Sequence, residues 1–113
     1  MPDYVMLMKL TAKGAANIDD SPNRITAAKE LWEGLGGTLT SFHATFGEYD
    51  FVAVGSAPDD WSAAFFAKEM ARLGDVTSMT MRAINEEEWL SVLARQKDWI
   101  ERKKGMLQEP GPA

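Results

Sequence analysis

The single histidine of the chain, His43, is the side chain best suited to proton transfer near neutral pH. It stands between Ser41 and Thr45 in a strand-like run, and the period of two places these three polar side chains on one face. An imidazole in such a row can act as a general base or bind a ligand. The competing structural interpretation is a ring packed at a subunit interface. We take Ser41, His43 and Thr45 as the candidate site, on an otherwise apolar inner sheet face.

A second polar pair, Tyr49 and Asp50, follows a glycine at the entry to the next strand. In a catalytic interpretation Asp50 is a base or ligand, and Tyr49 donates a hydrogen bond to substrate. In a structural interpretation Asp50 accepts hydrogen bonds from backbone amides near the turn, and Tyr49 fills a gap beside the first strand. Burial of Asp50 under apolar neighbours would displace its pKa and favour the catalytic interpretation.

Four of the seven methionines, Met6, Met8, Met79 and Met81, fall on two strands that are expected to be neighbours. Thioethers are soft metal ligands, which raises a copper or haem hypothesis. Methionine more often fills irregular core space, and it also suits a pocket for an irregular apolar ligand. We therefore expect these four side chains to line a ligand pocket, and we predict no metal site and no cofactor.

Composition excludes several classes of function. The 113 residues fit one domain with its own core. The absence of cysteine rules out disulfides, thiolate nucleophiles and cysteine-ligated metals. A net charge of −5 opposes nucleic-acid binding. No apolar run is long enough for a membrane span, and the first residues do not resemble a signal peptide, so the protein is expected to stay in the cytoplasm.

The candidate residues are positioned by a hairpin over residues 42–54, with its turn at Gly47 and Glu48. Its strands are predicted over residues 38–46 and 49–56. A buried strand over residues 4–12 and a helix over residues 22–35, capped by Asp20 or Ser21 and stopped by two glycines, precede it.

After the hairpin, Asp59 is predicted to cap a second helix that ends at Gly74. Its apolar stripe is predicted as Trp61, Ala64, Phe65, Met70 and Leu73. A strand over residues 75–84 leads directly into a last helix, which is capped by Asn85 and ends near Gly105.

This order of elements predicts an α+β, ferredoxin-like βαββαβ fold. Its four-stranded antiparallel sheet carries two helices on one face, and a C-terminal helix is appended. The other face of the sheet stays bare. Yet the first strand carries apolar side chains on both faces, Val5 and Leu7 on one and Met6 and Met8 on the other. A second copy is the expected cover, giving a homodimer and possibly a higher homo-oligomer. The alternative is that the C-terminal helix covers this face within one chain.

Five motifs follow one another along these elements: Tyr4-Val5, the helix entry from Asn17-Ile18 to Ser21-Pro22, Leu35-Gly36-Gly37, Gly47-Glu48-Tyr49-Asp50 and Ala57-Pro58-Asp59-Asp60. In this order they resemble the GYD domain family of small bacterial proteins. The resemblance covers residues 3 to about 88 and implies a dimeric α+β barrel. It implies no common reaction.

The expected organisation is a GYD-type domain over residues 1–88, a helical extension over 89–107 and a flexible tail over 108–113. One functional hypothesis is a homodimer that binds or transforms a small, largely apolar molecule on the inner sheet face near His43. The alternative is a non-catalytic module that binds a ligand or another protein. Fold analogy alone favours the enzyme, which is weak support.

Overall fold

The computed structural model describes residues 1–104, in two units that divide between Ala83 and Ile84. The first unit holds β1 (Asp3–Leu10), α1 (Ala12–Ala16), the short 3-10 helix η1 (Ile18–Asp20), α2 (Ser21–Gly34), β2 (Thr38–Ala44), β3 (Phe51–Ser56), α3 (Asp60–Leu73) and β4 (Val76–Ala83). The second unit holds α4 (Glu86–Lys103).

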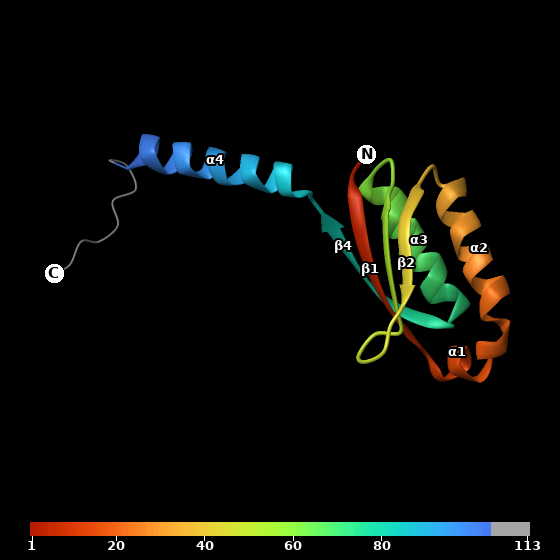
Figure 1. Cartoon of the computed structure of the whole chain (residues 1–113). Helices are drawn as coiled ribbons and strands as arrows, with labels where there is room; N and C mark the ends of the chain where they lie inside the picture. The colour runs from red at the N-terminus through yellow and green to blue at the C-terminus, as the bar shows by residue number, and fades with distance from the viewer. Residues whose placement is uncertain (105–113) are drawn as a thin grey trace. The chain divides into compact units, whose positions relative to one another are not determined.

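The sheet has the strand order β2-β3-β1-β4, and every neighbouring pair is antiparallel. Helices α2 and α3 lie on the same face of it (Figure 1). Two right-handed crossovers produce this arrangement. The predicted ferredoxin-like α+β fold is therefore confirmed.

The core lies between the sheet and these two helices. Along β1, Tyr4, Met6 and Met8 are buried, while the residues between them are only half-buried. Trp32 of α2 is the largest fully buried side chain among the described residues. Its ring centroid lies 6.2 Å from that of Tyr4 and 5.1 Å from that of Phe66 of α3, and both pairs meet edge to face. Edge-to-face aromatic pairs of this kind fix the packing of helix on sheet more specifically than aliphatic contacts do.

The helix ends follow the predicted chemistry in α3 and α4. Asp59 accepts a hydrogen bond from the Ser62 amide at 2.8 Å, and Asn85 accepts one from the Glu88 amide at 2.8 Å. Gly74 ends α3 with φ of 80°. At the start of α2, Asp20 is the N-cap residue, one of the two that were predicted, but its side chain caps no backbone amide. Its carboxylate accepts from the side chains of Asn23 and Arg24 instead.

The structure corrects three further expectations. The hairpin strands are shorter than predicted, since the connection runs over residues 45–50 and the Phe46 side chain is fully exposed. A one-turn helix, α1, occupies the stretch predicted as a simple break. The apolar face of α3 is rotated: Ala63 and Phe66 are buried, whereas Trp61 is 70% and Phe65 43% exposed.

Helix α4 has no buried residue. Its large apolar side chains, Trp89, Leu90, Val92, Leu93, Trp99 and Ile100, are each at least 39% exposed. The predicted helix end near Gly105 and the predicted tail lie outside the described residues. Within residues 1–104 no helix has the length and apolarity to cross a bilayer.

Candidate functional site

The sheet face opposite α2 and α3 is largely apolar. Strand pairing decides its composition, because residues directly opposite each other share a face. Met81 pairs with Val5, Met79 with Leu7, and Val54 with the same Val5 from the other side. We call this surface the open face; its apolar members are Val5, Leu7, Val52, Val54, Met79 and Met81. Met79 and Met81 are 50% and 39% exposed, so the first unit by itself leaves this surface uncovered.

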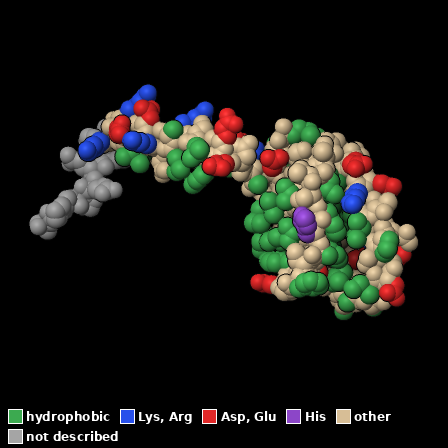
Figure 2. Space-filling model, viewed as in Figure 1, with side chains coloured by type: hydrophobic (Ala, Val, Ile, Leu, Met, Phe, Trp, Pro, Cys, Tyr) green, Lys and Arg blue, Asp and Glu red, His purple; other side chains and the backbone are tan. Residues whose placement is uncertain are grey.

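His43 lies on the open face, where it pairs with Val52. Its side chain is exposed, and Figure 2 shows it next to a patch of hydrophobic side chains. Ser41 pairs with Val54 and shares this face with His43 through the two-residue period of the strand. A β-bulge between Leu39 and Ser41 shifts the register before Ser41 and turns Leu39 to the helix side. The predicted juxtaposition of Ser41 and His43 is thus present in the structure.

The other predicted ligand-binding residues do not join this pair. Met6 and Met8 are buried on the helix side of the sheet, on the opposite face from Met79 and Met81. Met79 and Met81 share the open face with His43, but β4 and β2 are opposite edges of the sheet. Three strand spacings separate them, about 14 Å. The thioethers therefore cannot form one pocket wall around His43 within a single chain.

Thr45 lies beyond the end of β2, in the loop that carries the Gly-Glu-Tyr-Asp motif. Its hydroxyl donates to the Tyr49 carbonyl at 2.6 Å, and its amide donates to the Asp50 carbonyl at 2.8 Å. Gly47 at the loop tip has φ of 130°, a conformation that disfavours side chains. Thr45 therefore closes the loop on itself and does not extend the row of Ser41 and His43.

Asp50 ties this loop to the end of β1. Its carboxylate accepts a hydrogen bond from the Leu10 amide at 2.7 Å, and its amide donates to the Met8 carbonyl at 2.8 Å. Tyr49 lies under the ammonium of Lys9, 5.4 Å from the ring centroid. Both motif residues thus contact β1 and continue the β1–β3 pairing by one residue. This is the arrangement that the structural interpretation of the pair describes.

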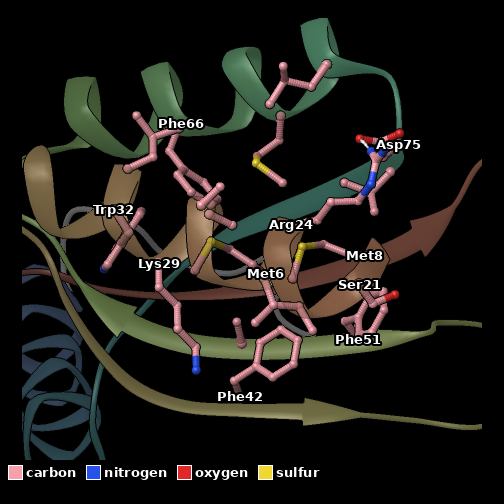
Figure 3. Close-up of a pocket in the computed structure, with 18 of the residues that line it drawn as sticks. Met6, Met8, Ser21, Arg24, Lys29, Trp32, Phe42, Phe51, Phe66 and Asp75 are labelled. Carbon is pink, nitrogen blue, oxygen red and sulfur yellow. Dashed lines mark ion pairs between the residues drawn. The ribbon is translucent and has the colours of Figure 1, made fainter. Parts of the chain in front are cut away.

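A cavity of about 280 Å³ lies on the other side of the sheet, between the sheet, α2 and α3. Figure 3 shows Met6, Met8, Phe42 and Phe51 pointing into this region from the strands. Its walls are predominantly apolar. This cavity was not predicted from the sequence; the available signal was the small Ala28 on the predicted inward stripe of α2, opposite two methionines.

Three charged side chains line the same cavity. Arg24 of α2 forms an ion pair with Asp75, and it also binds Asp20 at 3.1 Å. Lys29, just over one helical turn further along α2, holds its ammonium 5.7 Å from the centroid of the Phe42 ring. Within residues 1–104 no carboxylate forms an ion pair with Lys29. The lining therefore carries one positive charge that is not neutralised by an acidic neighbour.

At the end of the sheet where β1 begins, Tyr4 reaches the start of α3. Its hydroxyl donates to Asp60 Oδ1 at 2.5 Å, and Arg82 of β4 approaches the same oxygen at 3.5 Å. Burial raises the pKa of the Tyr4 phenol, and the hydrogen bond to Asp60 raises it further. This group therefore stays protonated at neutral pH and acts as a hydrogen-bond donor that fixes α3 to the sheet.

The outer surface of α3 carries an aromatic pair. The rings of Trp61 and Phe65 stack with centroids 5.6 Å apart and an interplanar angle of 25°. Exposed stacked aromatics are more informative than single exposed apolar residues, because large aromatic side chains are enriched at protein interfaces. The pair lies on the helix layer, on the opposite side of the first unit from the open face.

Comparisons with known proteins identify one relative by sequence and two solved structures of similar fold. A relative from Thermus thermophilus, named glutamine synthetase and cystathionine beta-lyase binding protein, is 35% identical over 85 residues, covering 74% of this chain and 90% of the relative. The solved structure of FFRP-DM1 has a TM-score of 0.53 at 19% identity and covers 74% of this chain and 100% of its own. The structure of TTHA0845, also from Thermus thermophilus, has a TM-score of 0.49 at 20% identity, covering 75% and 95%.

At 19% identity the likeness to FFRP-DM1 shows the fold alone. The family assignment comes from the sequence. The GYD domain family matches residues 4–93, which is most of the chain and includes the first turns of α4. The predicted resemblance is confirmed, and the chain belongs to the GYD domain family.

Proposed function

We propose that this chain is a homodimeric, non-catalytic binding protein whose partner is a metabolic enzyme. The observation that carries the proposal is the 35% identity, over nearly the whole relative, to a protein named for binding glutamine synthetase and cystathionine beta-lyase. The motif for which the family is named has a structural role here, since the Asp50 carboxylate accepts a hydrogen bond from the Leu10 amide of β1. A binding role fits that use better than proton transfer at Asp50.

The open face supports the dimer. Its six apolar side chains lie on all the strands except β2, and Met79 is half exposed in the single chain. Monomeric proteins rarely expose a contiguous apolar surface of several strands. Two copies that pack open face to open face about a two-fold axis cover it, which gives the α+β barrel that the family resemblance implies.

The aromatic pair on α3 is the proposed contact with the partner enzyme. It belongs to the helix layer, so a dimer built through the open face leaves Trp61 and Phe65 accessible in both copies. Their stacking fixes one ring against the other before binding. Pre-ordered aromatic side chains lose little conformational entropy in a complex and often act as binding hot spots.

The test is direct binding, by surface plasmon resonance, to glutamine synthetase and cystathionine beta-lyase purified from the same organism. We expect saturable binding to at least one of them, weakened about 30-fold by Trp61→Ala. Trp89→Ala on α4 is the matched control, because Trp89 is 51% exposed but belongs to the second unit. Absence of binding to both enzymes would reject the proposed partner class, and an unchanged affinity of Trp61→Ala would reject the surface.

A small molecule bound on the open face near His43 is a second candidate. The specific observation is that His43 pairs with Val52 and shares its face with Ser41. Two polar side chains thus lie at the border of an apolar surface. In a dimer this surface would be enclosed between two sheets. Native mass spectrometry of gently purified protein tests the idea. A co-purified molecule lost on His43→Ala would support it, whereas retention by His43→Ala would remove His43 from the site.

A further inference from the structure

We propose that the cavity between the sheet, α2 and α3 binds a small apolar carboxylate, with its hydrocarbon part inside and its carboxylate at Lys29. This site is separate from the open face and from the proposed partner surface. All the residues that form it belong to the first unit.

The size of the cavity is the first argument. Protein interiors are close-packed, and voids larger than a water molecule are few in each domain. A space of about 280 Å³ in a unit of this size is close to the lower end of small-molecule pockets. Apolar cavities of even half this volume stay dry and bind small hydrocarbons.

The walls are the second argument. Thioethers of Met6, Met8 and Met70 line the cavity from β1 and α3, and the rings of Phe42 and Phe51 stack 5.6 Å apart on the strand side. Methionine side chains adapt to irregular apolar shapes because three of their bonds rotate freely. Such walls select an apolar body but specify no polar pattern inside.

Charge gives the third argument. Arg24 forms ion pairs with Asp75 and Asp20, so these two carboxylates already neutralise its charge. Lys29 contacts only the Phe42 ring among the interactions that residues 1–104 supply, and its side chain is exposed at the edge of the cavity. Figure 3 shows its long stem running beside the cavity wall with the ammonium at the end near Phe42. An anionic group at the entrance can therefore pair with Lys29 while the rest of the ligand stays apolar.

The test uses methionine methyl groups as reporters. Protein labelled with ¹³C at the methionine methyls is titrated with hexanoate and with phenylacetate, and 1-hexanol serves as the uncharged comparison. We expect saturable shifts of the Met6, Met8 and Met70 signals at millimolar ligand, with Met79 and Met81 unmoved. Shifts confined to Met79 and Met81 would place the ligand on the open face and overturn the proposal, as would no shift at all.

Two pairs of variants locate the contacts. Ala28→Leu fills the cavity from α2, while Ala64→Leu makes the same change on the exposed side of α3. We expect Ala28→Leu to weaken hexanoate binding at least about tenfold, equivalent to losing the contacts of one or two buried methylenes. Ala64→Leu should bind as the wild type does. Equal binding by both variants would show that the ligand is outside the cavity.

Lys29→Met tests the carboxylate. It keeps an unbranched side chain of similar length and removes only the charge. We expect hexanoate to bind about fivefold more weakly and 1-hexanol to be unaffected, the size typical of a solvent-exposed ion pair. If Lys29→Met binds both probes as the wild type does, the carboxylate assignment is wrong. Circular dichroism of each variant verifies the fold, and the methyl reporters in the wild type test for cavity binding even if a variant fails to fold.

Discussion

At the scale of single residues, the Gly-Glu-Tyr-Asp loop shows how one carboxylate can serve as part of a strand. The pairing of β1 with β3 ends at Met8 and Phe51, and Asp50 then supplies both a backbone donor and a side-chain acceptor to β1. The Leu10 amide would otherwise lack a partner on that side of the sheet. A motif that looks catalytic in sequence is thus explained by the need to satisfy backbone groups where a ladder stops.

This use of Asp50 predicts a stability effect. Asp50→Ala removes the acceptor of the half-buried Leu10 amide, so we expect the free energy of unfolding to fall by about 1–3 kcal/mol. Asp50→Asn keeps an acceptor oxygen and should lose clearly less. Urea unfolding of the three proteins measures the difference. Equal losses in both variants would mean that the carboxylate charge matters, and not the hydrogen bond.

Among the candidate site residues, the sequence located His43 and Ser41 correctly on one face but misplaced their surroundings. The bulge at Thr40 reverses the side of Leu39, and no local pattern announces it. The methionine set failed for another reason. The topology predicts correctly that the first and last strands are neighbours. The face that each methionine occupies depends on the register, in which Met81 pairs with Val5 and so lies opposite to Met6 and Met8. A shift of one residue would have placed all four on one face.

At the scale of elements, a close backbone contact holds the one-turn helix α1 in place. Gly14 of α1 is buried, and a Cβ there would clash with the Asp75 carbonyl. That carbonyl is held in place, since it accepts the Thr11 amide at 3.0 Å. The one-turn helix α1 therefore depends on tertiary contact with the end of α3, which is why its own sequence gave little helix signal.

Two glycine substitutions separate close packing from helix propensity. Gly14→Ala should lower the free energy of unfolding by about 1–3 kcal/mol, because the new methyl group displaces backbone. Gly34→Ala, in the last turn of α2 with nothing within 4 Å of the new atom, should raise it by about 0.5–1 kcal/mol. Thermal and urea unfolding report both. A gain in Gly14→Ala would show that α1 does not pack against Asp75 in solution.

The cap of α3 gives a pH dependence. The Ser62 amide and hydroxyl hold the pKa of Asp59 below its usual value. Because the folded pKa is the lower one, the cap stabilises the protein above the ordinary aspartate pKa, and its contribution is lost as the pH falls through the depressed value. We expect Asp59→Ala to melt at lower temperature than the wild type at neutral pH, with the gap narrowing as the pH falls below the ordinary aspartate pKa. A gap that stays constant would show that the cap does not depend on ionisation.

The elements themselves were largely predictable, and the exceptions share a cause. Caps at Asp59 and Asn85 and the stop at Gly74 act locally, so residue type and position predicted them. The inward face of α3 was not predictable, since this helix carries apolar residues almost all around. Only packing against Trp32 selects Phe66 for the core and leaves Trp61 outside.

At the scale of the whole molecule, the first unit has two apolar surfaces and covers only one. The helix face is closed by α2 and α3, whose packing leaves a cavity, while no other element of the first unit covers the open face. A net charge of −5 opposes self-association through repulsion but does not cover apolar strands. The open face and the apolar side of α4 are the two surfaces from which an oligomer can be built.

A matched pair of charge substitutions distinguishes these two surfaces. Met79 on the open face and Leu90 on α4 are similarly exposed in the single chain, 50% and 56%, so glutamate at either position leaves the fold of one chain intact. We expect Met79→Glu to dissociate the dimer, because two buried carboxylates would face each other across the two-fold axis. Leu90→Glu should remain dimeric.

Light scattering after gel filtration, at micromolar protein, measures the mass of both variants. A wild-type monomer would remove the dimer, and the enclosed site near His43 with it. Dissociation by Leu90→Glu alone would instead assign the interface to α4. The open face would then be available to a partner protein, and the aromatic pair on α3 would no longer be the largest apolar surface left for the enzyme. In that case we would expect Met79→Glu, and not Trp61→Ala, to weaken enzyme binding.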